Sequence, residues 1–262
     1  MAQQPKLTDE ETCERTKHIV QGITLPTGVF LPSEDLYYLA GLLTNKSILK
    51  LERVSRDAGD RSKLRVSCKI RHHSQEGLLL LQRYFGGALK EGELKITQKD
   101  LAPLLETFLE LLPLQEKMRI CLDLLKLKSI PTGISRRSIY EEMEENFKRR
   151  HYYILPDVPE EYEGDYIGGL LDDCLNCFIY PRGEDLTLIT TLNFKYPELF
   201  GLVSVEGSKP KFIETIRLIN DFWCYCREIQ AGLKEFLEKS SLGPQGNPEK
   251  WSLRNAAPEE RV

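Results

Sequence analysis

The stretches YLAGLL (residues 38–43) and YIGGLL (residues 166–171) decide the fold, and they align at an offset of 128 residues. Each has the apolar character of a buried helix, but glycine inside a helix costs about 0.5–1 kcal/mol relative to alanine. Chance glycines in a frayed helix would not explain why the pattern occurs twice. Loss of the Cβ atom lets two helix axes approach more closely than the usual distance of roughly 8–10 Å. We therefore predict that the two helices pack together through four small residues: Ala40, Gly41, Gly168 and Gly169.

The segments around the two stretches repeat one order of elements. After the N-cap candidate Ser33, the first half indicates a helix to residue 43, strands at 48–54 and 61–71, a helix at 74–85, a strand at 94–96, and helices at 98–111 and 115–128. The second half indicates a helix at 165–173, strands at 178–180, 185–194 and 199–205, and a helical segment at 212–238. Because the same order of elements occurs twice, we predict an α+β protein with two pseudo-symmetric αββαβα repeats.

Five regions follow from this pattern. We expect an N-terminal extension at 1–32, a first repeat at 33–130, a connector with a charged helix at 131–160, a second repeat at 161–240 and a flexible tail at 241–262. We also expect a monomer that contains an internal pseudo-dimer.

Composition narrows the classes of protein further. The 262 residues are 41% hydrophobic and 29% charged, and they include seven cysteines, an odd number that argues against a disulfide scaffold. No apolar run approaches the roughly 20 residues that span a bilayer, so no membrane partner is expected. The acidic segment from Met1 to Glu14 has neither a signal core nor the character of a transit peptide. We expect an intracellular protein, with an organelle not excluded.

The sharpest charge feature is the segment 61–71, RSKLRVSCKIR. Side chains alternate between the two faces of a strand, so one face carries cations and the other carries Leu64, Val66, Cys68 and Ile70. The net charge of −4 means that any surface for nucleic acid is local. An ordinary solvated sheet face is the alternative, but the run lacks interspersed acids.

The two helix stretches resemble the first half of the LAGLIDADG motif of homing endonucleases and intron maturases. The resemblance covers roughly residues 33 to 238, and it implies motif helices packed at a pseudo-twofold axis, with two antiparallel sheets forming a saddle over nucleic acid. In that family an acidic residue near the end of each motif helix holds a divalent metal ion, Mg²⁺ in an active nuclease. Aligned with the motif, this chain has Lys46 and Cys174 at those two positions.

Neither residue suits that chemistry. Lys46 is a cation that would repel Mg²⁺ but can contact phosphate, and Cys174 offers a soft sulfur where Mg²⁺ requires oxygen. Asp173 lies about 100° around the helix from position 174, so it reaches the axis only if the helix end changes locally. We therefore expect no catalytic residue and no cofactor, with Asp173 as the one rescue candidate. The residues predicted to contact nucleic acid are Lys46, Lys50, Arg53, Arg61, Lys63, Arg65, Lys69 and Arg71.

Three functions remain open at this point. The favoured hypothesis is a catalytically inactive LAGLIDADG-like protein that binds structured RNA or DNA, like a maturase or a ribonucleoprotein component with protein partners. The second is an active, Mg²⁺-dependent homing endonuclease. The third is a protein-interaction module without nucleic acid, which the acidic pI of about 5.8 favours.

Overall fold

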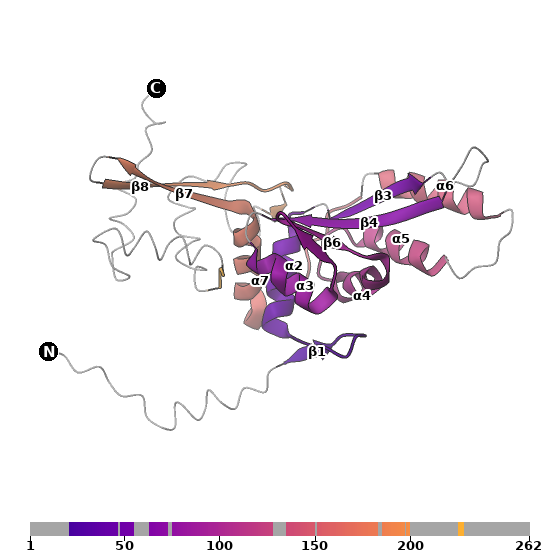
Figure 1. Ribbon diagram of the computed structural model, residues 1–262, viewed down its shortest axis with the longest axis horizontal. Helices are drawn as coiled ribbons and strands as arrows, with labels where there is room; N and C mark the ends of the chain where they lie inside the picture. The colour runs from indigo at the N-terminus through magenta and orange to yellow at the C-terminus, as the bar shows by residue number, and fades with distance from the viewer. Residues whose placement is uncertain are drawn as a thin grey trace.

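Two helices stand side by side at the centre of the molecule (Figure 1). The computed structural model describes residues 21–46, 48–54, 63–72, 75–127, 135–149, 151–182, 185–196, 198–199 and 225–227. The central helices are α2 (Ser33–Thr44) and α7 (Glu160–Cys174), and every residue from Tyr38 to Thr44 in α2 is buried. The prediction that Ser33 is the N-cap is wrong, because the helix already includes Ser33 and follows Pro32 without a side-chain cap.

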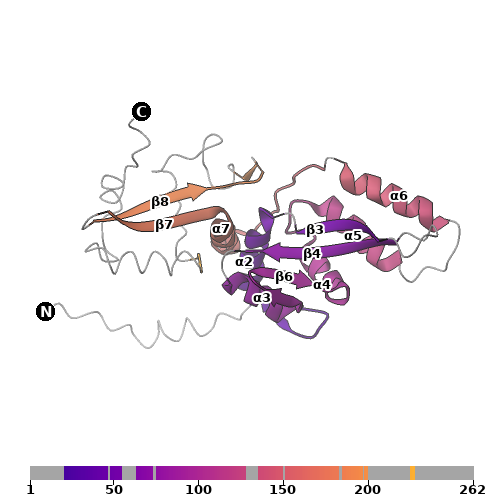
Figure 2. The same ribbon diagram turned by 45° about the horizontal axis from the view of Figure 1, so that its top comes forward.

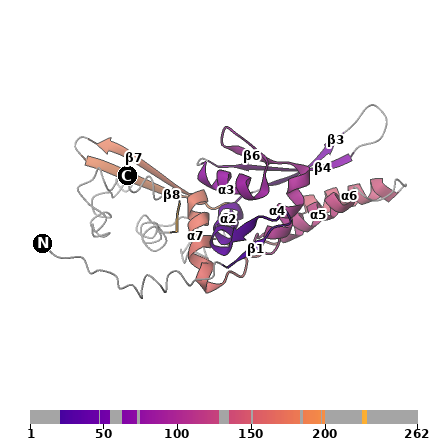
Figure 3. The same ribbon diagram turned by 60° about the horizontal axis from the view of Figure 1, so that its bottom comes forward.

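A four-stranded antiparallel sheet extends from one side of the helix pair. Its order is β3 (Leu49–Val54), β4 (Lys63–Arg71), β6 (Glu93–Ile96) and β5 (Ala88–Lys90). Helices α3 (Glu76–Phe85), α4 (Gln98–Phe108) and α5 (Gln115–Lys126) pack under one face, as Figure 3 shows. The alternation predicted for β4 is confirmed, since Leu64, Val66, Cys68 and Ile70 are all buried. Burial of this apolar row against the helices fixes the register of the strand.

Two short pairings were not predicted. Strand β5 pairs with β6, so the first repeat contains a second hairpin in addition to the αββαβα order. A further hairpin, β1 (Gly22–Thr24) with β2 (Phe30–Pro32), precedes α2 in the region expected to be an N-terminal extension. Gly28 has a φ of 80° in its turn, a backbone conformation that glycine adopts without steric cost. Strands β1, β2 and β5 have three residues each, which is too short for a period-2 pattern to be recognised.

The second half extends from the opposite side of the helix pair, so that the two sheets form two wings (Figures 1 and 2). Helix α7 continues directly into β7 (Leu175–Arg182), which forms an antiparallel hairpin with β8 (Asp185–Leu192). The predicted strand at 199–205 and the helical segment at 212–238 lie outside the described residues, apart from residue 199 and residues 225–227.

The connector contains α6 (Ser135–Lys148), as the charged pattern predicted, and this helix packs against α5. Across the described part of the chain, none of the helices combines the length and the apolar character that a bilayer span requires.

Candidate nucleic-acid interface

The two central helices touch backbone to backbone at Gly41 and Gly169. A Cβ atom added to Gly41 would lie 2.9 Å from the amide nitrogen of Leu170 and still closer to the carbonyl oxygen of Tyr166. A Cβ atom added to Gly169 would meet Leu42 and Tyr38 in the same way, at 2.9 Å from the Leu42 amide nitrogen. The two contacts are equivalent under an offset of 128 residues, which is the pseudo-twofold relation that the sequence predicted.

The other predicted interface residues have different surroundings. A Cβ atom on Gly168 would lie 2.7 Å from the backbone and Cβ of Tyr225, so this glycine accommodates the segment 225–227 against α7. Ala40 is fully buried, and its carbonyl oxygen accepts the hydroxyl proton of Thr44 at 2.8 Å. The double glycine in α7 therefore allows two close contacts, that of Gly169 with α2 and that of Gly168 with Tyr225.

Two tyrosines form hydrogen bonds between the same two helices, and their partners lie near the C-terminal ends of the helices. The Tyr38 hydroxyl donates to Asp172 Oδ2 at 2.9 Å, and the Tyr166 hydroxyl lies 2.7 Å from Thr44 Oγ1. Asp172 also accepts the backbone N–H of Arg227 at 2.7 Å. Asp172 is thus a buried structural acceptor between the repeats.

The helix ends bring Lys46 and Asp173 into contact. The Lys46 ammonium donates to Asp173 Oδ1 and, at 2.9 Å, to the carbonyl oxygen of Arg71. The buried imidazole Nε2 of His72 lies 3.7 Å from the same Asp173 oxygen. Asp173 was expected to reach the axis only if the helix end changed locally, and its contact with Lys46 forms while Asp173 is still inside α7. Lys46 lies one residue beyond the C-cap of α2, and its long side chain extends to the carboxylate of Asp173 in the other repeat.

Cys174, at the motif position where the family carries a metal-binding acid, is buried in this structure. Burial, and after it the neighbouring Asp173 carboxylate, raises the pKa of the Cys174 thiol well above its ordinary value. The thiol therefore stays neutral, whereas a metal ligand has to be a thiolate. Within the described ranges, no group of three or more His, Cys, Asp or Glu side chains is arranged to hold a metal ion. With a bound ammonium at one position and a buried thiol at the other, the site does not fit Mg²⁺.

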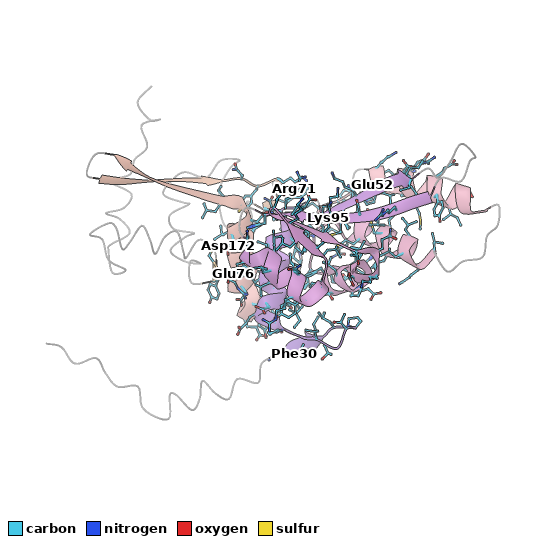
Figure 4. All side chains as sticks on the ribbon, in the orientation of Figure 1. Phe30, Glu52, Arg71, Glu76, Lys95 and Asp172 are labelled. Carbon is cyan, nitrogen blue, oxygen red and sulfur yellow. The ribbon has the colours of Figure 1, made fainter. Side chains whose placement is uncertain are left out.

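The face of the first sheet that the helices leave uncovered is rich in cations. Lys50 is opposite Ser67, and Arg65 is two residues before Ser67 on the same strand. The strand register therefore places Lys50 and Arg65 on this face together with Lys69 and Arg71. Two lysines that the sequence prediction missed, Lys90 and Lys95, lie on the same face. We call the uncovered face the basic face, and it comprises Lys50, Arg65, Lys69, Arg71, Lys90 and Lys95. Figure 4 labels Arg71 and Lys95 on the upper side of the sheet, opposite the helices.

Two acids also lie on the basic face, contrary to the expectation from β4 alone. Glu52 is directly opposite Arg65 and accepts a hydrogen bond from Ser67 at 3.2 Å. Glu93 pairs with Arg71 at 2.6 Å. That hydrogen bond, and then the charges of Arg71, Lys69 and Lys95, lower the pKa of the Glu93 carboxyl. Both acids come from neighbouring strands, so only the sheet register could reveal them.

Three predicted nucleic-acid contacts, Arg53, Arg61 and Lys63, are not among the six residues of the basic face. Arg53 lies opposite Leu64, on the helix-covered face, and its guanidinium binds Glu144 of α6 at 2.6 Å. It is therefore wrong to place Arg53 among the cations of the basic face. Arg61 lies outside the described residues, and for Lys63 the strand register places only its backbone, opposite Val54.

Comparison with known proteins identifies the fold. No protein-family model matches the sequence, and no curated protein matches it. Among solved structures, the chain is similar to the LAGLIDADG homing endonuclease I-GzeII in complex with DNA target, at 12% identity and a TM-score of 0.51, over 87% of this chain and 99% of that one. This likeness shows the fold that the resemblance of the two helices predicted.

Two further solved structures are similar to this chain with lower TM-scores. The LAGLIDADG meganuclease I-CpaMI bound to uncleaved DNA has 14% identity and a TM-score of 0.45, over 85% of this chain and 99% of that one. The meganuclease I-SmaMI bound to uncleaveable DNA has 10% identity and a TM-score of 0.42, over 81% of this chain and 97% of that one.

Proposed function

We propose that this protein binds nucleic acid through the basic face and does not cleave it. The observation that carries the proposal is the uncovered sheet face, where six cations outnumber two acids among the described side chains. Such a surface follows a phosphate backbone, because Lys and Arg replace the counterions condensed on nucleic acid.

The pairing of Lys69 with Lys95 supports an anionic partner in particular. These lysines are directly opposite each other on adjacent antiparallel strands. Like charges at directly opposed positions destabilise a sheet, so the pair contributes nothing favourable to folding. A phosphate bound between them would relieve the repulsion.

The fold supports the same partner. The I-GzeII structure, which shares the fold, is a complex with a DNA target. In the present chain the basic face and the C-terminal ends of α2 and α7 are connected, because Lys46 binds the carbonyl oxygen of Arg71, the last residue of β4. One bound strand could therefore contact both.

Loss of cleavage is the second half of the proposal. A metal-dependent nuclease uses divalent ions to stabilise the attacking and leaving oxygens, and those ions need oxygen ligands. The two motif positions carry Lys46 and the buried thiol of Cys174 instead. We therefore expect that Mg²⁺ supports no phosphodiester hydrolysis here.

One experiment tests binding. Fluorescence anisotropy of labelled duplex DNA, duplex RNA and hairpin RNA should show saturable binding that weakens as salt rises. The triple variant Arg65→Ala, Lys69→Ala, Lys95→Ala should lose it, whereas Arg119→Ala on the helix-covered side should not. If none of the three nucleic acids binds at low salt, the proposal is wrong, and a protein-interaction module becomes the better reading.

An active endonuclease is the second candidate, because Asp173 does reach the junction between the helices. A supercoiled plasmid incubated with Mg²⁺ or Mn²⁺ distinguishes the two candidates. We expect no nicking. Robust cleavage that Asp173→Asn abolishes would establish the endonuclease and overturn the inactive reading.

A further inference from the structure

The junction between α2 and α7 holds a positive charge of the protein's own. Lys46, Asp173 and His72 converge there, and their side chains are 16%, 6% and 0% exposed. A carboxylate at such low exposure is costly unless a positive charge or several hydrogen bonds compensate for it. The Lys46 ammonium supplies that compensation directly.

The ammonium also connects three elements. It contacts Asp173 at the end of α7, it donates to the carbonyl oxygen of Arg71 at the end of β4, and its own residue follows α2. An ammonium group carries three N–H donors. Two of them have partners in the structure, and one of these partners is the carbonyl oxygen of Arg71, whose side chain belongs to the basic face.

Neighbouring oxygen ligands at the helix ends are engaged in other contacts. Asn45, the pseudo-symmetric counterpart of Asp173, donates to the carbonyl oxygen of Asn193 at 3.1 Å and accepts the N–H of Lys195 at 2.6 Å. Asp172 and Thr44 are engaged by the two tyrosines. A hard divalent cation needs several oxygen ligands at once, and these side chains are each held by protein donors.

We propose that Lys46 is a built-in cation that takes the place of a divalent metal ion between the two helices. It neutralises Asp173 so that a phosphodiester can lie over the junction without any metal. This inference rests on the proposed function for its nucleic-acid part, but its electrostatic part concerns the free protein and can be tested there.

The first test measures Mn²⁺ binding to the full chain, without nucleic acid, by electron paramagnetic resonance. We expect that wild-type protein shows no Mn²⁺ binding that depends on Asp173. Lys46→Gln removes the charge and releases Asp173 Oδ1 and the carbonyl oxygen of Arg71. Together with the new amide oxygen these offer three oxygen ligands, so the variant should create one saturable Mn²⁺ site. The double variant Lys46→Gln, Asp173→Asn should lose that site again. Circular dichroism verifies that each variant is folded, and Lys46→Met is the replacement if Lys46→Gln is not.

The second test measures binding of labelled duplex DNA at constant ionic strength with EDTA or with Ca²⁺. Wild-type affinity should be the same in both. Lys46→Gln should bind about tenfold more weakly in EDTA, as expected when one charged hydrogen bond is lost, and Ca²⁺ should restore part of the loss. Lys99→Ala on α4, which removes a lysine from the helix-covered side, is the matched control and should behave like wild type.

The two tests separate the inference from the function. A wild-type Mn²⁺ site that Asp173→Asn abolishes would overturn the inference, and so would a folded Lys46→Gln protein that gains no Mn²⁺ site. Absence of nucleic-acid binding in every condition would instead refute the proposed function, while the Mn²⁺ titration would still decide the role of Lys46.

Discussion

The Tyr38 hydroxyl donates to a carboxyl group, that of Asp172, whereas its pseudo-symmetric counterpart Tyr166 meets the hydroxyl of Thr44. The Thr44 proton is already donated to the carbonyl oxygen of Ala40, so Tyr166 is the donor in its pair. The two repeats therefore use one geometry with two acceptors of different strength. Hydrogen bonds to charged groups contribute about 1.5–3 kcal/mol, and neutral ones about 0.5–1.5 kcal/mol.

This asymmetry predicts unequal costs for removing the two hydroxyls. Tyr38→Phe should lower the free energy of unfolding by about 2 kcal/mol, and Tyr166→Phe by about 1 kcal/mol. Urea denaturation followed by tryptophan fluorescence would measure both. Equal costs would mean that the carboxyl group of Asp172 is no stronger an acceptor for a tyrosine than the hydroxyl of Thr44.

Backbone contact between the helices predicts a strong effect of one methyl group. Gly169→Ala places a Cβ atom against the carbonyl oxygen of Tyr38, and neither backbone can yield without separating the helices. We expect a loss of about 3 kcal/mol or more in the free energy of unfolding. Gly41→Ala should have the same effect, because its contact with Tyr166 is equivalent.

Gly164→Ala is the matched control for this prediction. A Cβ atom there meets the ring of Tyr225, a half-exposed side chain that can rotate away. The better helix propensity of alanine, about 1 kcal/mol, should offset much of the cost. If Gly169→Ala were as mild as Gly164→Ala, the close packing of α2 and α7 would be wrong.

The basic face predicts a specific change in salt dependence. For a duplex, the logarithm of the binding constant falls with the logarithm of salt concentration by roughly 0.9 for each phosphate neutralised. Arg65→Ala and Lys69→Ala should each weaken binding and reduce the slope by about 1. Anisotropy titrations at several salt concentrations measure the slope, and Arg119→Ala should leave it unchanged. An unchanged slope in both variants would place the contact surface elsewhere.

Asp165 predicts a stability that depends on pH. Burial first, and then the charges of Glu34 and Asp35 against the opposing effect of Arg227, raises the pKa of Asp165 to about 6 from its usual 3.8. The folded protein therefore holds a proton between these values that the unfolded chain has released. Linkage then requires that stability falls as the pH rises through this window, and that the unfavourable contribution is complete above pH 6.

Asp165→Asn removes this contribution. Because the side chain is only half-buried, we expect the variant to be more stable at pH 7.5 by on the order of 1 kcal/mol, with the gain shrinking as the pH is lowered toward 4. Thermal unfolding at several pH values measures it, with Asp123→Asn on the exposed side of α5 as control. A gain of the same size at every pH would contradict a titrating Asp165.

Periodic features of the sequence predicted much of the fold. The glycines at positions 41 and 169 conflict with helix propensity, and only close backbone packing explains them. The alternation in β4 separates a buried apolar row from a cationic row because strand side chains have a period of two. Each signal is carried by residues within a few positions of each other, so it can be recognised from the sequence alone.

The candidate site could be predicted only in part. Lys69 and Arg71 were found from their own strand, but Lys90 and Lys95 belong to β5 and β6 and join them only through the sheet register. Arg53 shows the opposite error, because closeness in sequence placed it near β4 while the pleat turned it to the other face. Cross-strand neighbours are set by pairing, which no local pattern contains.

Residue order and periodicity were therefore enough to indicate two repeats joined by a small-residue helix pair. The resemblance to the LAGLIDADG motif then placed Lys46 and Cys174 at the two acidic positions. The partner of Lys46 was not accessible in the same way. Asp173 lies within α7, and it meets Lys46 because that side chain, one residue beyond the C-cap of α2, extends across to the other repeat. Contacts between residues more than a hundred positions apart in sequence depend on where each helix or strand ends and on how these elements pack. Only the tertiary structure decides both.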